Sequence, residues 1–223
     1  MGKKLKKIMK LNNKGFSLIE LSIVLIIIGL LVAGITGGAS LIKSAELRAV
    51  MSEVRNYQTA VNAYYTATGK LPGGFDDSGL NSDKMNFKFT NHAWHQIADE
   101  KIMDDRPVNA DQDTTALTSI TVSDGMKSKI KGSYYVLGNS KDMDMNVVLM
   151  LGGTETATDV TGNIDTKLAS SISSKDAKFL DEKMDNGVIT TGKIRSFAGK
   201  TATCDYDSTV TSKVCVIAFG VGL

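Results

Sequence analysis

A single carboxylate stands in an otherwise apolar stretch near the beginning of this 223-residue chain. Glu20 is the only ionisable side chain between Phe16 and Ile42. A charged side chain at the centre of a membrane helix costs about 3 kcal/mol, and such residues usually carry function. Two interpretations of Glu20 remain open. It is either half of an ion pair in an apolar core or an acid that reaches the water of the lipid headgroups.

The apolar run that contains Glu20 is long enough to cross a lipid bilayer. It extends over residues 16–42, and a membrane-spanning helix needs about 20 apolar residues. Six lysines and no acidic residue precede Gly15. Because positively charged flanks stay on the cytoplasmic side, we expect a cytoplasmic N-terminus and export of everything after Ile42.

A basic leader is followed by Gly15 and Phe16, and then by Glu20 near the start of an apolar helix. This order resembles the class III leader of type IV pilins and type II secretion pseudopilins. The resemblance implies that prepilin peptidase cleaves between Gly15 and Phe16, and that the new N-terminus of Phe16 is methylated. It also implies a role for Glu20 in assembly, with its carboxylate facing the free amine of a neighbouring subunit's first residue.

The same resemblance implies a set of partners and locations. The expected partners are other copies and other pilins in a filament, prepilin peptidase, an assembly ATPase and an inner-membrane platform protein. The chain would first span the inner membrane once, with a periplasmic C-terminal domain, and then enter a pilus or pseudopilus that can reach the cell surface. Three parts follow: a leader (1–15), a membrane-spanning and filament-core helix (16–42) and a pilin-like globular domain (43–223).

The overall charge of the chain depends on the leader. Full-length, the chain has a formal charge of +2, but loss of the six leader lysines would leave 20 basic residues against 24 acidic ones, a net side-chain charge of −4. The basic residues after Lys43 are interspersed with acids, so no basic patch indicates a nucleic-acid partner.

The helix is expected to continue beyond the membrane segment. From Leu47 to Tyr65 apolar residues recur at three- and four-residue steps, which predicts an amphipathic helix ending before Gly69 and Pro72. Glycines at 34, 37 and 38 predict a soft, extensible segment there, or a site where neighbouring helices pack closely.

The remainder of the chain predicts a small antiparallel sheet with shorter helices. Strand patterns cover 134–137, 146–151 and 214–221, and residues 106–131 indicate loops with a short strand near 120–122. Further helices are expected over 91–103 and 174–185. The predicted fold class is α+β, with one long N-terminal helix packed on a small antiparallel sheet, as in pilins.

Two cysteines, Cys204 and Cys215, lie in the part expected to be exported. An oxidising periplasm favours a disulfide between them, whereas a reducing compartment would leave two buried thiols. Pilins commonly close a C-terminal loop with such a pair, so the resemblance favours the disulfide.

Three groups of residues contain side chains that can bind metal ions. His92 and His95, with Asp99 on the same helical face, lack the pattern of a metalloprotease, and we expect a surface helix with Trp94 packed inward. Residues 142–146 resemble the start of an EF-hand loop without its later ligands. Some pseudopilins bind calcium in a late loop, but Asp181, Asp185 and Asp205 form no ligand pattern here, so no cofactor or metal site is assigned.

No catalytic motif is present, so we expect a structural subunit and not an enzyme. The leading hypothesis is a subunit of a type IV pilus or related filament. The alternatives are a secretion pseudopilin, a minor pilin that displays a binding domain in an insertion at 76–131, and a secreted protein cleaved near Ser40.

Overall fold

The computed structural model describes most of the chain after residue 14. The chain forms two compact units. Among the described residues, those up to Ser44 belong to the first unit, and Ala45–Leu223 form the second. The described residues are 15, 17–74, 84–111, 115–154, 156–157, 167–198, 204–206 and 212–223.

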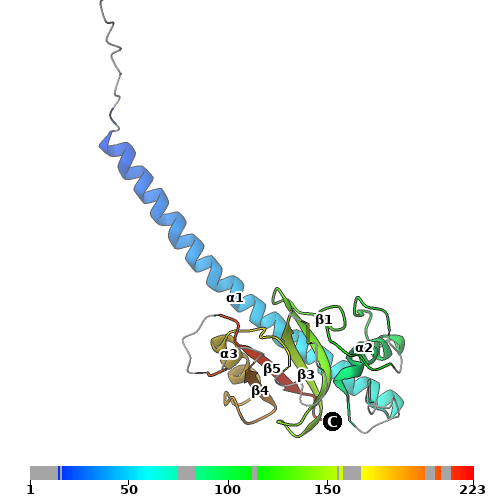
Figure 1. Ribbon diagram of the computed structural model, residues 1–223. Coiled ribbons are helices and arrows are strands. Elements are labelled where there is room, and N and C mark those ends of the chain that lie inside the picture. Colours follow the sequence, from blue (N-terminus) through cyan, green and yellow to red (C-terminus); the bar gives the residue numbers. More distant parts are fainter. Residues whose placement is uncertain are drawn as a thin grey trace, which may run out of the picture. The chain divides into compact units, whose positions relative to one another are not determined.

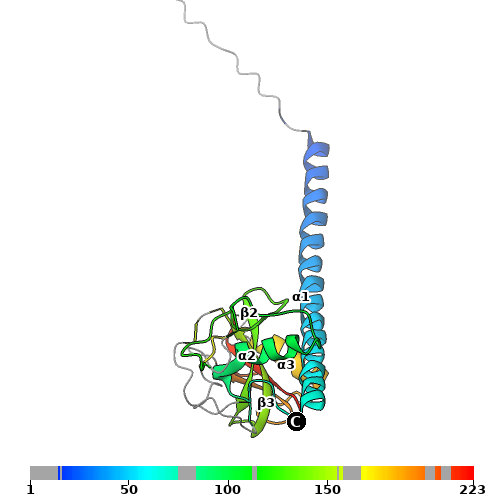
Figure 2. The same cartoon turned by 90° about the vertical axis from the view of Figure 1, so that its right-hand side faces the viewer.

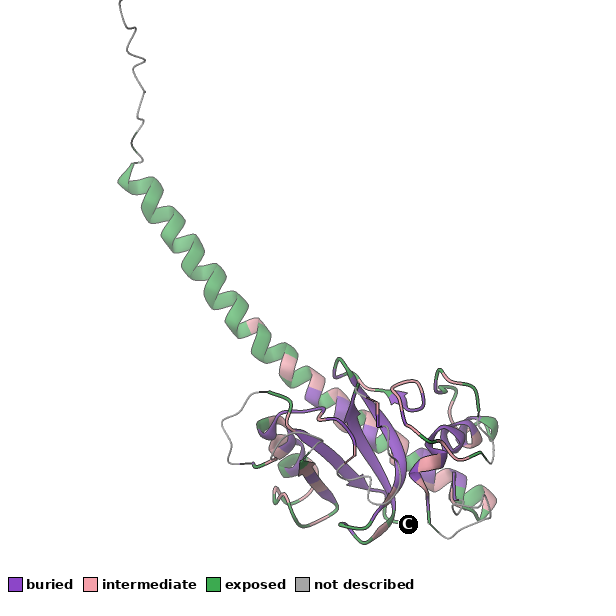
Figure 3. Cartoon of the chain, in the orientation of Figure 1, coloured by how far each residue is buried: buried purple, intermediate pink, exposed green. Residues whose placement is uncertain are grey.

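Helix α1, Leu18–Thr68, begins in the first unit and ends in the second. Within the first unit its large apolar side chains are exposed on every side of the helix (Figure 3). The backbone groups of such a helix bond to one another, as a lipid or apolar protein environment requires. The long helix predicted from the sequence is confirmed. It is uninterrupted at Gly34, Gly37 and Gly38, and the softness expected there stays a prediction.

The second unit contains a five-stranded sheet in the order β1-β2-β3-β5-β4 (Figure 1). All neighbouring strands are antiparallel. The predicted α+β architecture with an antiparallel sheet is therefore confirmed. The strands are β1 (Met126–Lys127), β2 (Ser133–Ser140), β3 (Met145–Gly153), β4 (Ile194–Ala198) and β5 (Cys215–Gly220).

The second half of α1 packs its apolar stripe against one face of this sheet (Figure 2). Val50, Val54 and Val61 are fully buried there, together with side chains of β2, β3 and β5. Each valine that is removed from water contributes about 1.5–3 kcal/mol. This helix-on-sheet contact is the packing that the spacing from Leu47 to Tyr65 predicts.

Two polar contacts fix the position of α1 along the strands. The Tyr135 hydroxyl on β2 donates to the Glu53 carboxylate at 2.9 Å, and the Gln58 amide donates to the Gly220 carbonyl at the end of β5 at 2.8 Å. Glu53 also accepts from Ser128 and from the Lys129 backbone amide. Because directional bonds at two points exclude a sliding movement, α1 has one register on the sheet.

Helices α2 (Thr90–Asp99) and α3 (Ser174–Met184) add to the same core. In α2, Trp94 is fully buried and its ring meets Tyr57 of α1 edge-on, with 5.1 Å between ring centroids. Helix α2 follows a short 3₁₀ turn, η1 (Phe87–Phe89), and stops before residue 103, since Lys101 has the left-handed φ of 60°. Helix α3 matches the predicted range closely.

Among the described residues, the other face of the sheet is covered by the short 3₁₀ turn η1 and by irregular segments. Its inward side chains, which include Tyr134, Val148 and Ala218, pack against Phe87, Ile120 and other residues of those segments. As a result, β2, β3 and β5 are buried on both faces. This explains why their sequences are continuous apolar runs without an alternation of polar and apolar residues.

Three details differ from the sequence-based expectations. Strand β4 was not predicted, because only Ile194 and Ser196 of its five residues are buried. The short strand expected at 120–122 is reduced to an isolated bridge between Ile120 and Ala157. The segment 76–131 is not a separable insertion, since its described residues include Trp94 and other members of the main core.

One glycine of the sheet makes room for an aromatic ring. A Cβ atom on Gly138 in β2 would lie 2.4 Å from Cγ of Phe87, which is buried in η1. We expect Gly138→Ala to lower the free energy of unfolding by about 1–3 kcal/mol because the ring must move. Gly152→Ala on β3 is the matched control, since the three atoms nearest to its Cβ would all belong to the Leu168 side chain, at 3.4 Å or more. Equal losses in urea unfolding would contradict this explanation.

Candidate processing and assembly site

Two hydrogen bonds that involve Ser17 close the beginning of α1. The Glu20 carboxylate accepts from the Ser17 backbone amide at 2.8 Å, and the Ser17 hydroxyl accepts from the Ile19 amide at 3.3 Å. This is a capping-box arrangement in which the Ser17 hydroxyl accepts from the Ile19 amide and not from the Glu20 amide, and it satisfies two amides at the start of the helix with side chains of its first turn. A carboxylate in the first turn also interacts favourably with the helix dipole.

The capping box is a role of Glu20 that we did not predict. Its signal was present in Ser17-Leu18-Ile19-Glu20, the Ser-x-x-Glu pattern that precedes an apolar run. Of the two carboxylate oxygens, one accepts the Ser17 amide within the chain. Glu20 and its immediate neighbours along the chain are exposed, so the group is accessible to another molecule.

Two other polar side chains of the apolar segment are satisfied within the helix. The hydroxyls of Ser22 and Thr36 donate to backbone carbonyls of the preceding turn, at 2.8 and 3.1 Å. Such bonds remove the cost of placing a hydroxyl in an apolar environment. Glu20 is therefore the only charged group that the described residues 17–42 present to lipid or to a neighbouring helix.

Of the two residues at the predicted cleavage point, only Gly15 is described, and it is exposed. Phe16 and the lysine-rich leader lie outside the described residues. Cleavage after Gly15 and methylation of Phe16 therefore stay predictions.

At the other end of the chain the expected disulfide is present between Cys204 and Cys215. Cys215 begins β5 and is fully buried, so the bond ties the preceding segment to the sheet. For a loop of this length the chain-entropy estimate is about 3 kcal/mol of stabilisation.

A buried carboxylate holds the same C-terminal segment to α3. Asp181 accepts from the Tyr206 hydroxyl at 3.0 Å and from the Gly187 amide at 3.0 Å. The Tyr206 hydroxyl also lies 2.9 Å from the Ser196 hydroxyl on β4. Burial raises the pKa of the Asp181 carboxyl, and the bonds from Gly187 and Tyr206 oppose that shift. Asp181 thus has a structural role that its sequence context did not indicate.

The two histidines are buried and have separate partners. Nδ1 of His92 lies 2.7 Å from Asp111, and Nε2 of His95 lies 3.1 Å from the Asn109 carbonyl. Helix α2 is therefore more deeply buried than the surface helix that we expected, although Trp94 does point inward. Both histidines tie the segment after α2 to that helix.

Within the described ranges, no group of three or more His, Cys, Asp or Glu side chains could hold a metal ion. Of the EF-hand-like residues, 142–144 lie in the turn between β2 and β3, where Asp144 adopts a left-handed φ of 51°, and 145–146 begin β3. Calcium binding is not shown.

Comparison with known proteins bears on the first unit alone. Residues 10–36 match the family model described as the prokaryotic N-terminal methylation motif. The chain carries the prepilin-type leader of type IV pilins and pseudopilins. No curated protein matches the chain. The motif indicates a structural subunit rather than an enzyme, and α1 is long and apolar enough to anchor such a subunit in a membrane.

The Asp181 carboxyl should make part of the folding stability pH-dependent. Its pKa is above the ordinary value of 3.8 in the folded chain, so the folded state binds this proton more tightly than the unfolded state. The stability that the tighter proton binding adds to the folded state is fully present below pH 3.8 and is lost as the pH rises through the raised pKa. We therefore expect Asp181→Asn to gain stability relative to wild type between acid and neutral pH.

The measurement is urea unfolding of the disulfide-intact full chain in detergent across this pH range. Asp104→Asn, which removes an exposed carboxylate, is the control. A constant difference between Asp181→Asn and wild type at every pH would contradict the assignment.

Proposed function

We propose that this chain is a structural subunit of a type IV pilus or a related filament. Prepilin peptidase would remove residues 1–15, and residues 16–42 would anchor the subunit in the inner membrane and later form the filament core. Residues 43–223 would be the periplasmic, and then extracellular, pilin-like domain. The observation that carries the proposal is a prepilin-type leader continued by a helix whose apolar side chains are exposed in the first unit and buried in the second.

The exposed apolar surface supports polymerisation for a thermodynamic reason. In the membrane these side chains contact lipid, and in a filament they would contact the same segment of other copies. The exchange leaves the apolar surface out of water in both states, so packing and polar contacts decide which state is favoured. Glu20 is the charged group that can favour the filament over the membrane-bound state.

Glu20 is proposed to act first as a cap and then as an ion-pair partner. Cleavage after Gly15 would place a positively charged amine on Phe16, directly beside the amide that Glu20 accepts in the single chain. In the filament the carboxylate would meet the Phe16 amine of a neighbouring copy. An ion pair offsets the cost of leaving two charges in an apolar core.

The remaining partners belong to the same proposal. Prepilin peptidase, an assembly ATPase and a platform protein of the inner membrane would process and polymerise the subunit. A secretion pseudopilin and a minor pilin with a binding domain are the alternative functions. The genes encoded beside this one separate them, because pilus and secretion machineries have different companions.

The processing step can be tested by the mass of the mature chain. We expect native material to begin at Phe16, to have 208 residues and to carry one additional methyl group, because the leader matches the methylation motif. Gly15→Leu, which places a bulky side chain at the cleavage point, is expected to retain the leader. A mature chain that begins near Ser40 would contradict the proposal and support an ordinary secreted protein.

The two roles of Glu20 can be separated by substitution. Glu20→Gln keeps an oxygen that accepts the Ser17 amide but removes the charge, whereas Ser17→Ala weakens the cap and keeps the charge. Removing one partner of a buried ion pair costs about 3–5 kcal/mol, so we expect Glu20→Gln to lower filament yield at least about tenfold. Loss of the Ser17 cap costs about 1 kcal/mol and should lower the yield much less.

Filaments are sheared from cells and quantified against the membrane-bound pool, which should be unchanged in both variants. Wild-type filament yield from Glu20→Gln, with reduced yield from Ser17→Ala, would show that Glu20 acts as a helix cap and not as an ion-pair partner.

A further inference from the structure

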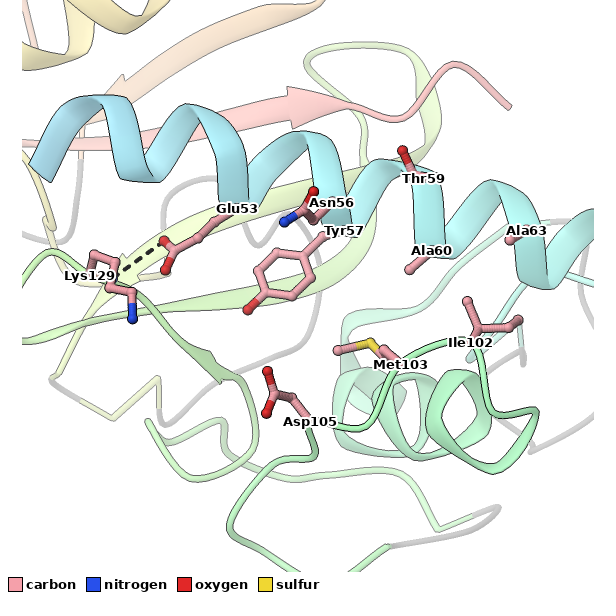
Figure 4. A pocket seen from close by; sticks show the side chains of 10 residues that line it. All are labelled: Glu53, Asn56, Tyr57, Thr59, Ala60, Ala63, Ile102, Met103, Asp105 and Lys129. Carbon is pink, nitrogen blue, oxygen red and sulfur yellow. Dashed lines mark hydrogen bonds between the residues drawn. The ribbon is translucent and has the colours of Figure 1, made fainter. Parts of the chain in front are cut away.

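Two grooves lie on opposite sides of α1 within the second unit, and their charges have opposite signs. The first, here called the acidic groove, has a volume of 610 Å³ and lies between α1 and the segment that follows α2. Figure 4 shows the Tyr57 ring pointing between Glu53 and Asp105, with Met103 opposite Ala60. The two carboxylates exceed the single cation of its lining, Lys129.

The second, here called the basic groove, has a volume of 530 Å³ and lies between α1 and the residues around the beginning of β4. Its lining includes Arg55 of α1 and Lys193, and it contains no acidic side chain. Within the described part of the chain, neither cation has an ion-pair partner, and Arg55 is exposed. The groove therefore presents two positive charges that no acidic side chain of the described residues pairs with.

Helical geometry places the two grooves on opposite flanks of α1. Glu53 and Arg55 are two positions apart, which corresponds to about 200° around a helix. Between them, Asn56, Thr59 and Ala63 form an uncharged ridge of small side chains, and Thr59 lines both grooves. A ridge of this kind lets another chain approach the helix closely without burying a charge.

We propose that the basic groove of one copy of this chain contacts the acidic groove of the next copy. The inference rests on the proposed filament function and adds a lateral contact between the globular units. Charge complementarity favours a second copy of this chain as the partner. Arg55 and Lys193 are positively charged and can pair with carboxylates, and Asp105 is an exposed carboxylate in the groove on the other flank.

The position of the grooves determines the type of assembly. A contact between two different surfaces leaves one free groove of each sign at the two ends of every pair. Such a heterologous contact adds copies without limit when the rotation does not close a ring, whereas a symmetric dimer would bury the same surface on both subunits. The arrangement is therefore suited to a filament.

The contact is weak for each pair of copies and repeated along the filament. Exposed ion pairs contribute little individually and are screened by salt. The apolar helices would supply most of the association, and the grooves would fix the rotation of one globular unit relative to the next.

The first test uses the wild-type chain. A carbodiimide joins a carboxylate to an amine by forming an amide with loss of water, and it links only groups in direct contact. We expect filaments to yield a peptide that joins Asp105 or Glu53 to Lys193, detected by mass spectrometry. The full chain as a monomer in detergent should not yield it, because the two grooves face away from each other.

The second test exchanges the charges. We expect Arg55→Glu and Asp105→Lys each to lower filament yield about fivefold, since each replaces attraction by repulsion. The double variant should recover most of the yield, because it restores the pair with reversed signs. Lys175→Glu and Glu182→Lys, both exposed on α3 and outside the two linings, are the matched controls and should assemble normally.

Each outcome has a defined meaning. Normal yield from the single variants, together with loss of filaments in Glu20→Gln, would overturn this inference and leave the proposed function intact. Reduced yield that the double variant does not recover would mean that the grooves bind another partner and not each other. A symmetric dimer as the largest assembled species would contradict both the inference and the filament function.

Discussion

The structure depends on one helix, α1, whose first part is suited to an apolar environment and whose second part packs on the sheet of the globular unit. From Leu18 to about Ile42, α1 has apolar side chains on all sides, and its backbone groups and the hydroxyls of Ser22 and Thr36 bond within the helix. From Leu47 to Tyr64 only one stripe is buried, against the sheet.

The contacts that hold the second half are both apolar and directional. Valines at 50, 54 and 61 supply burial, while Glu53 and Gln58 bond to β2 and to the end of β5. These two kinds of contact have different consequences. Burial gives the helix its affinity for the sheet, and the hydrogen bonds give it one register. That register in turn determines which side chains of α1 stay exposed and can contact other molecules.

The sequence predicted those elements whose signals are local. The leader, the long helix and helix α3 follow from charge, hydropathy and 3.6-residue periodicity, and the three longest strands follow from continuous apolar runs. The capping box at Ser17 could have been predicted from its four-residue pattern and was overlooked. Strand β4 could not, because a short edge strand with two buried residues has almost no compositional signal.

The same difference between local and long-range signals applies to the candidate functional residues. Glu20 and the predicted cleavage point after Gly15 belong to one short motif, so the sequence alone predicts them. The pairing of Cys204 with Cys215 needed only proximity along the chain and an oxidising compartment. By contrast, the bond between Asp181 and Tyr206 joins residues 25 positions apart, and neither has a recognisable local context. Only the packing of α3 beside the C-terminal segment brings these two side chains together.

What the sequence determined by itself is that this chain has a prepilin-type leader, a membrane-length helix and an α+β globular part. The tertiary structure decided which surfaces of that globular part are available. Residues 76–131 appeared to be an insertion, and folding places Trp94 in the main core instead. Glu53 and Arg55 are neighbours in the sequence, yet they line different grooves of opposite charge. The physical reason is that a helix directs residues two positions apart to opposite sides, and only the sheet determines which sides are exposed.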